Sequence, residues 1–238
     1  MIDISKIRIS PDNTHHIYDG KPLYSKRFVR VMSYHQPGIA AVQDDVAAYH
    51  IDVKGAPIYK QRFIKAFGFY EGIAAAQDDT GYYHIDIKGN PRYPERYSWV
   101  GNFQEGLCVV RDNDNKYIHI RPDGRPAYKE RYAYVGDYKY GIACVYTSRG
   151  MASHIDGNGE LIHGKWFLEC GNYHKGYATA RDHSGYFHID LKGIPLYEER
   201  YQWIEPFYNG VAYCKTMDGM LVTRTEDGTV MQIGGEPL

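Results

Sequence analysis

The sequence predicts an all-β protein built from about seven copies of one meander of 34 or 35 residues. One phrase, an aromatic or aliphatic residue followed by His-Ile and then by a Gly-x-Pro turn, recurs along the chain. Turn residues recur at the same period, and no segment has the 3.6-residue period of an amphipathic helix. Several markers that keep one period over 238 residues indicate a repeat array.

Three residues mark each repeat. The histidine of the phrase stands at His16, His50, His84, His119, His154 and His188. The glycine that ends the following strand stands at Gly20, Gly55, Gly89, Gly124, Gly159, Gly193 and Gly228. A second glycine precedes a short apolar run at Gly38, Gly72, Gly106, Gly141, Gly176 and Gly210. The repeats therefore begin near residues 4, 38, 72, 106, 141, 176 and 210.

The repeat that begins at Gly72 illustrates the predicted elements. The apolar run after Gly72 predicts a strand, and the polar segment 78–81 predicts a hairpin turn, since Asp and Gly favour such turns. Residues 82–87 alternate in character and predict a second strand. Pro91 keeps the next segment out of a central strand, and residues 96–103 predict an extended return to the next repeat.

One repeat of this size cannot bury its own apolar face, so consecutive repeats are expected to stack within a single domain, residues 1–238. A closed toroid, resembling a propeller, leaves only short edges, whereas an open β-solenoid leaves two ends that need caps. We favour closure and keep the solenoid as the alternative. The tail, residues 229–233, is expected to supply a strand of different character.

Composition excludes several classes of protein. The 28 Lys and Arg residues nearly balance the 29 Asp and Glu residues, so no overall charge favours nucleic acid or an anionic membrane. No apolar stretch is long enough for a transmembrane helix, and no secretory signal is visible, so we expect a cytoplasmic protein. The four cysteines follow no metal-binding or disulfide spacing, and we expect them to be buried, reduced thiols.

The repeat resembles the bacterial WG-type β-repeats, in which a Gly-Leu-Ala-x-Val strand leads to Tyr-Ile-Asp-x-x-Gly and a Pro-containing return. The Trp-Gly pair that names the family is replaced here by pairs such as Tyr82-Tyr83, with His at the next position, so this chain is a His-Ile-Asp variant. The resemblance implies a scaffold, often an interaction module, and no reaction.

The recurring histidine is expected to hydrogen-bond a backbone group of the next repeat, because six copies separated by whole repeats are too widely spaced to share one metal ion. We therefore predict no metal and no cofactor.

The arginine that stands seven residues after the strand-ending glycine is expected to bind loop carbonyls. Its copies are Arg27, Arg62, Arg96, Arg131 and Arg200. A fixed pair with the His-Ile-Asp aspartate is not supported, because both partners occur together in only three repeats.

The fifth repeat departs most from the pattern, with His163 in place of Tyr and Trp166 in place of Arg. We predict a binding patch around His163, Trp166, Glu169 and Cys170, since a repeat protein can acquire a specific function where its repeats diverge. Trp99, Trp166 and Trp203 are candidates for stacking on sugar rings.

No sequence motif indicates catalysis: the chain has no Gly-x-Ser-x-Gly elbow, P-loop or His-Glu-x-x-His. We therefore expect a non-enzymatic module that binds another protein. A lectin-like binder of a glycan or small ligand is the first alternative, and an unrecognised enzyme is the second.

Overall fold

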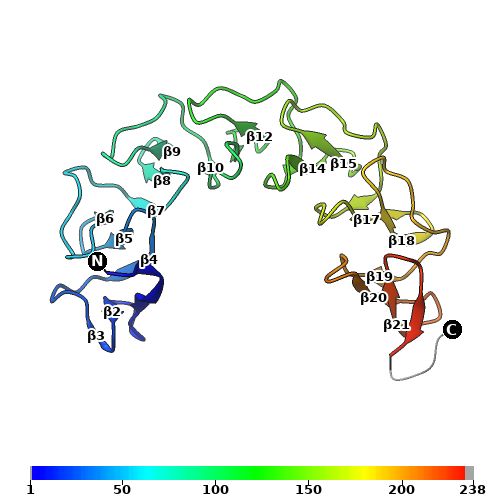
Figure 1. The fold of residues 1–238 in the computed structure, drawn as a ribbon. Coiled ribbons are helices and arrows are strands. Elements are labelled where there is room, and N and C mark those ends of the chain that lie inside the picture. The colour runs from blue at the N-terminus through cyan, green and yellow to red at the C-terminus, as the bar shows by residue number, and fades with distance from the viewer. Residues whose placement is uncertain (1, 234–238) are drawn as a thin grey trace. The chain divides into compact units, whose positions relative to one another are not determined.

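The computed structural model describes residues 2–233 and contains seven small antiparallel sheets, which confirms the all-β prediction. The chain divides into two compact units, one that ends at Pro126 and one that begins at Ala127. We number the sheets in chain order: sheets 1 to 4 lie in the first unit and sheets 5 to 7 in the second (Figure 1). Ring closure and a single domain stay predictions.

The first unit opens with a 3-10 turn, η1 (Ile4–Lys6), capped by the side chain of Asp3. Its four sheets each have three strands in sequential order. Sheets 1 and 2 are formed by β1 (Arg8–Ile9), β2 (His16–Tyr18), β3 (Lys21–Pro22), and by β4 (Arg30–His35), β5 (Ile39–Gln43), β6 (Ala48–Ile51). Sheets 3 and 4 are formed by β7 (Lys65–Tyr70), β8 (Ile73–Asp78), β9 (Gly81–Ile85), and by β10 (Trp99–Val100), β11 (Cys108–Arg111), β12 (Tyr117–Ile120).

The second unit has the same plan with one addition. Sheets 5 and 6 are formed by β13 (Tyr134–Val135), β14 (Ile142–Tyr146), β15 (Ala152–Asp156), and by β16 (Glu169–Cys170), β17 (Ala178–Asp182), β18 (Gly185–Ile189). Sheet 7 is formed by β19 (Trp203–Ile204), β20 (Val211–Lys215), β21 (Leu221–Thr225) and β22 (Val230–Gln232). The fourth strand, β22, confirms the strand expected in the tail.

Each of sheets 2 to 7 takes its first strand from the end of one sequence repeat and its other strands from the next repeat. In sheet 3, β7 precedes Gly72 and pairs with β8, which follows it. The turn between them consists of Glu71 and Gly72, both with positive φ, as a two-residue hairpin requires. The second glycine therefore lies inside a sheet, and every such hairpin joins two successive repeats.

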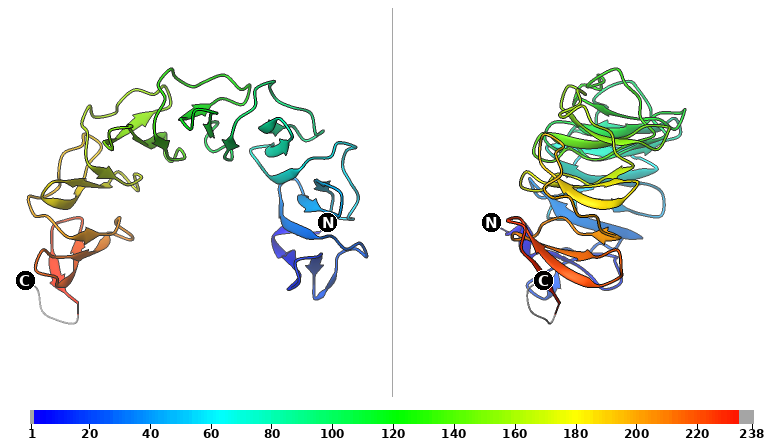
Figure 2. Two further views of the ribbon diagram at one scale, coloured as in Figure 1. Left: turned by 180° about the vertical axis from the view of Figure 1, so that it is seen from behind. Right: turned by 90° about the vertical axis from the view of Figure 1, so that its right-hand side faces the viewer.

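The strands are buried on both faces because each sheet packs against its neighbours in the same unit (Figure 2). In the first unit β7 contacts β5 and β6, and β10 contacts β9; in the second, β16 contacts β15 and β19 contacts β18. Tyr83, His84 and Ile85 of β9 are all buried, although they alternate between the two faces. No helix among residues 2–233 has the length and apolar character needed to cross a membrane.

In four of its copies, Gly55, Gly89, Gly124 and Gly159, the strand-ending glycine packs against the tyrosine of the preceding repeat. A Cβ atom on Gly124 would lie 2.5 Å from Cγ of Tyr93, and on Gly159 it would lie 2.4 Å from Cγ of Tyr128. Both glycines also have positive φ. The glycine therefore recurs for two reasons: the turn needs its backbone conformation, and the neighbouring ring occupies the space where a side chain would stand.

Candidate functional site

The recurring histidine lies buried between two consecutive sheets. In five copies its Nε2 atom lies 2.6–3.1 Å from a backbone carbonyl at or just beyond the first strand of the next sheet. The pairs are His16 with Met32, His50 with Phe67, His84 with Gly101, His154 with Gly171 and His188 with Glu205. His119 is equally buried. A contact with the backbone of the next repeat is the arrangement expected from the sequence.

The other ring nitrogen, Nδ1, faces the tyrosine that follows the Gly-x-Pro turn. The pairs are His16 with Tyr24, His50 with Tyr59, His84 with Tyr93 and His188 with Tyr197. A carbonyl only accepts, so Nε2–H donates to the carbonyl, and Nδ1 accepts from the tyrosine hydroxyl. Burial lowers the pKa of His50, His84 and His188 to about 4, so these rings are neutral at pH 7.

The Tyr93→Phe variant removes one of these hydroxyl groups and leaves Nδ1 of the buried His84 without its donor. We expect the free energy of unfolding to fall by about 1–3 kcal/mol, the usual effect of an unsatisfied buried acceptor. Tyr70→Phe, at an exposed tyrosine, is the control and should change stability by less than about 0.5 kcal/mol. Urea denaturation measures both, and equal stability of the two variants would contradict the assignment.

The recurring arginine binds loop carbonyls in its own repeat. Nη1 of Arg62 donates to the carbonyls of Tyr59, Lys60 and Gln61, and its guanidinium lies 4.0 Å from the centre of the Tyr49 ring. Equivalent carbonyl contacts are made by Arg27, Arg96, Arg131 and Arg200. These contacts fix the loop that carries the recurring tyrosine.

In two repeats this arginine has a carboxylate partner at the end of the strand that enters the hairpin turn, a pairing that the repeat pattern does not indicate. Arg96 contacts Asp78 at 3.4 Å, and Arg200 contacts Asp182 at 2.9 Å. The His-Ile-Asp aspartate has a different role, since Oδ1 of Asp86 accepts hydrogen bonds from the backbone N–H groups of Lys88 and Asn90. One acidic position therefore pairs with the arginine, and the other stabilises the turn after the second strand.

The fifth repeat differs from this pattern at the centre of the histidine contact. Nδ1 of His154 lies 3.1 Å from Nε2 of His163, which replaces the tyrosine. Nδ1 of His163 accepts from the backbone N–H of Lys165, so Nε2–H of His163 donates to His154. Burial again lowers the pKa of His154, to about 4. The ring of His154 therefore has a fixed orientation and a fixed partner on each side.

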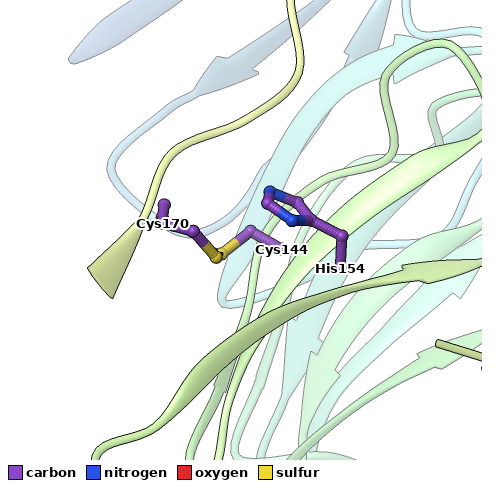
Figure 3. A group of neighbouring side chains, drawn as sticks. All are labelled: Cys144, His154 and Cys170. Carbon is purple, nitrogen blue, oxygen red and sulfur yellow. Dashed lines mark hydrogen bonds between the residues drawn. The ribbon is translucent and has the colours of Figure 1, made fainter. Parts of the chain in front are cut away.

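Two cysteines lie beside His154. Sγ of Cys144 is 3.1 Å from Sγ of Cys170, and the two sulfurs and a ring nitrogen of His154 lie within 4.8 Å of one another. All three residues are buried, and Figure 3 shows the two sulfurs meeting beside the imidazole. The four cysteines of the chain are buried thiols, none in a disulfide. Cys144, His154 and Cys170 could hold a metal ion.

A hollow of about 180 Å³ lies next to this cluster, between sheets 5 and 6. Its lining residues are Tyr146, Glu169, Cys170, Gly171, Thr179, Ala180 and Tyr186. Glu169 forms an ion pair with Arg181 and accepts a hydrogen bond of 2.8 Å from the hydroxyl of Tyr186. The hydroxyl of Tyr146 donates to the carbonyl of Cys170 at 3.2 Å. The hollow is thus lined by two aromatic side chains, Tyr146 and Tyr186, and by the carboxylate of Glu169, which is paired with Arg181.

Three of the predicted binding residues occupy one register position. Trp99, Glu169 and Trp203 are each the first residue of the first strand in their sheet. We call this position the register row; its members are Arg30, Lys65, Trp99, Tyr134, Glu169 and Trp203. Their cross-strand partners are Gln43, Gln77, Arg111, Tyr146, Arg181 and Lys215.

The structure separates the patch predicted in the fifth repeat into three places. Glu169 and Cys170 line the hollow, while His163 is half-buried against His154. Trp166 is 37% exposed in the loop that carries the recurring arginine elsewhere. Cys144 was missed, although its position in the repeat holds Ile, Ala, Val or Thr in other repeats and could have marked it. Binding by these residues stays a prediction.

Comparison with known proteins agrees with the repeat assignment. The family model "WG containing repeat" matches residues 85–117. No curated protein matches the chain.

Three solved structures are similar in fold. The computationally designed Ika8 protein is 12% identical, with a TM-score of 0.51 over 92% of this chain and 80% of that one. Hsv2p of Kluyveromyces lactis is 10% identical, with a TM-score of 0.48 over 89% and 81%. The WD40 beta propeller domain of Doa1 is 14% identical, with a TM-score of 0.38 over 84% and 81%. At 12% identity the likeness to Ika8, whose TM-score is 0.51, concerns the fold alone.

Proposed function

We propose that this chain, which carries a WG-type β-repeat at residues 85–117, is a non-enzymatic scaffold that binds a protein partner. The observation that carries the proposal is the part of the register row that lies in the second unit, namely Tyr134, Glu169 and Trp203. Sheets 5 to 7 have the same backbone arrangement, so these three side chains stand at the same position of their sheets. The residue type at this position nevertheless differs from sheet to sheet. Constant backbone with varied exposed side chains is the arrangement that repeat proteins use for recognition.

The row is rich in the residue types that dominate binding energies. In the second unit, Tyr134 is 51% exposed and Trp203 is 44% exposed, and Arg181 stands beside Glu169. Tyr, Trp and Arg are enriched among residues whose truncation weakens protein complexes by about 2 kcal/mol or more. This surface fits a protein partner whose aliphatic side chains contact Tyr134 and Trp203 and whose polar groups hydrogen-bond the Glu169–Arg181 pair.

Replacing both Tyr134 and Trp203 by Ala tests the proposal. We expect the affinity for a partner captured from the native lysate to fall by about 100-fold or more, the effect of losing two such residues. The matched control replaces Leu191 and Ile194, which are exposed to a similar extent in the turn after β18. Quantitative mass spectrometry of the captured proteins compares the variants.

The control variant should capture the same partner as the unchanged chain. The proposal is wrong if the Tyr134/Trp203 variant retains every interaction of the unchanged chain. A glycan array that retains the unchanged chain, and loses it after Trp203→Ala, would instead support the lectin-like alternative.

A further inference from the structure

We propose that Cys144, His154 and Cys170 form a binding site for one thiolate-preferring metal ion, with Zn²⁺ as the representative cation. Two thiols and an imidazole converge in a buried place, with their ligand atoms within 4.8 Å of one another. This donor set is typical of zinc, which binds sulfur at about 2.3 Å and nitrogen at about 2.0–2.1 Å. A modest separation of the two sulfurs accommodates the ion between them.

Comparison of the repeats shows that this cluster is a local departure from a common plan. Cys144 lies opposite the recurring histidine, where the other repeats with that histidine have Ile9, Ala41, Ala75, Val109 and Thr179. Cys170 stands at the position of Val31, Ala66, Val100, Val135 and Ile204. Neither cysteine is needed for packing, because aliphatic residues, and threonine in one sheet, fill the same places elsewhere.

The third departure, His163, contacts the same imidazole. Where other repeats have a tyrosine that donates to Nδ1, His163 donates from Nε2 in the metal-free chain. When Nε2 of His154 binds the ion in place of its proton, Nδ1 of His154 carries the proton and donates to Nε2 of His163, whose own proton moves to its Nδ1 and replaces the hydrogen bond from Lys165. A hydrogen bond to the second nitrogen of a ligating histidine is a regular feature of metal sites. Three departures from one repeat pattern therefore converge around one histidine.

The site also has a route to solvent and an open position. Cys170 lies at the wall of the hollow, together with Gly171 and Thr179. Three protein ligands leave the fourth position of a tetrahedral ion for water. Binding converts both thiols to thiolates, and their two protons pass to the solvent. A disulfide would use only the two cysteines and would leave His154 and His163 without a role in the cluster.

Metal titration of the full chain, reduced with a phosphine, tests the proposal. We expect one Zn²⁺ per chain with a Kd below about 1 µM, accompanied by release of about two protons at pH 7. Co²⁺ should give the near-ultraviolet charge-transfer absorption of thiolate ligands and the intense visible bands of a tetrahedral ion. Calorimetry in buffers of different ionisation enthalpy measures the released protons.

The variants restore the residues of the other repeats, so each should fold. Cys144→Val and Cys170→Val should each weaken zinc binding at least about 100-fold and abolish the charge-transfer band. His163→Tyr should weaken binding by about 10–100-fold, as loss of a group that orients a ligand does. Cys108→Ala and Cys214→Ala, at the other two cysteines, are matched controls and should bind as the unchanged chain does.

Three results would overturn the proposal. The first is the absence of Zn²⁺ and Co²⁺ binding by the reduced chain at micromolar concentration. The second is binding that both valine variants retain. The third is a Cys144–Cys170 disulfide in the oxidised chain combined with no metal binding after reduction, which would assign the pair to redox chemistry.

Discussion

Lowering the pH from 7 to 5.5 is expected to reduce the free energy of unfolding by about 5 kcal/mol. The effect comes from four buried histidines, His50, His84, His154 and His188, whose pKa falls from 6.5 to about 4 on folding. At pH 5.5 the unfolded chain has protonated these rings and the folded chain has not. Each ring accounts for about 1.2 kcal/mol of this loss, and the sum over the four rings is a large part of the roughly 5–15 kcal/mol typical of a domain.

The direction of this dependence follows from proton counting. The unfolded state binds more protons than the folded state between pH 6.5 and 4, so stability is lost as the pH falls through that window. The charged groups near these rings act in the same direction, because His35 near His50 and Arg224 near His188 are cationic when protonated. Carboxylates whose pKa is lowered, such as Asp78, start from 3.8 and act only below about pH 4.

Urea denaturation at a series of pH values measures the effect. The variant His84→Gln keeps a donor for the Gly101 carbonyl but cannot titrate. It should therefore take up about one proton fewer on unfolding between pH 6.5 and 4.5. Constant stability of the unchanged chain from pH 7 to 5 would show that these rings are not buried in their neutral form.

Gly124→Ala is expected to destabilise the protein by about 3 kcal/mol. The φ angle of Gly124 is +83°, which costs a residue with a side chain about 1–2 kcal/mol. The new Cβ would also meet Cβ and Cγ of Tyr93 at 2.5 Å, and such overpacking costs about 1–3 kcal/mol more. Chemical denaturation gives the change in unfolding free energy.

Gly106→Ala is the matched control, because Gly106 lies in the same repeat with a φ of +76° and has no atom within 4 Å of the added Cβ. Only the backbone cost applies there, about 1–2 kcal/mol. The two variants therefore separate the backbone conformation from the contact between repeats. Equal losses at the two positions would assign the role of Gly124 to its backbone conformation alone.

The repeat period predicted most of the local structure because the identity of the turn residues determines where the chain reverses. Gly72 and the polar turn at residues 78–81 mark the two hairpins of sheet 3, and the structure has both turns there. A repeat period gives the length of the unit but does not show at which residue the structural unit begins. The sequence therefore did not show that β7 joins the sheet of the following repeat. Which repeat supplies the first strand of a sheet depends on which two segments the hairpin at the second glycine brings side by side.

The candidate site was less predictable because its contacts cross from one repeat to the next. The fifth repeat was correctly singled out as divergent, and His163, Glu169 and Cys170 were named. The proximity of Cys144 to Cys170, 26 residues later, depends on the stacking of sheet 6 on sheet 5. Likewise, the pairing of Arg96 with Asp78 instead of Asp86 follows from the fold of the turn and could not be read from spacing.

A double-mutant cycle between Tyr93 and Gly124 tests most directly whether consecutive repeats are held together by this contact. In the unchanged chain, Gly124→Ala should remove about 3 kcal/mol of stability. In a chain that already carries Tyr93→Gly, both the ring and the Cβ of residue 93 are gone, and the same change should remove only the backbone contribution, about 1–2 kcal/mol. The account predicts a coupling energy of about 1–2 kcal/mol between the two positions, whereas strictly additive effects would contradict it.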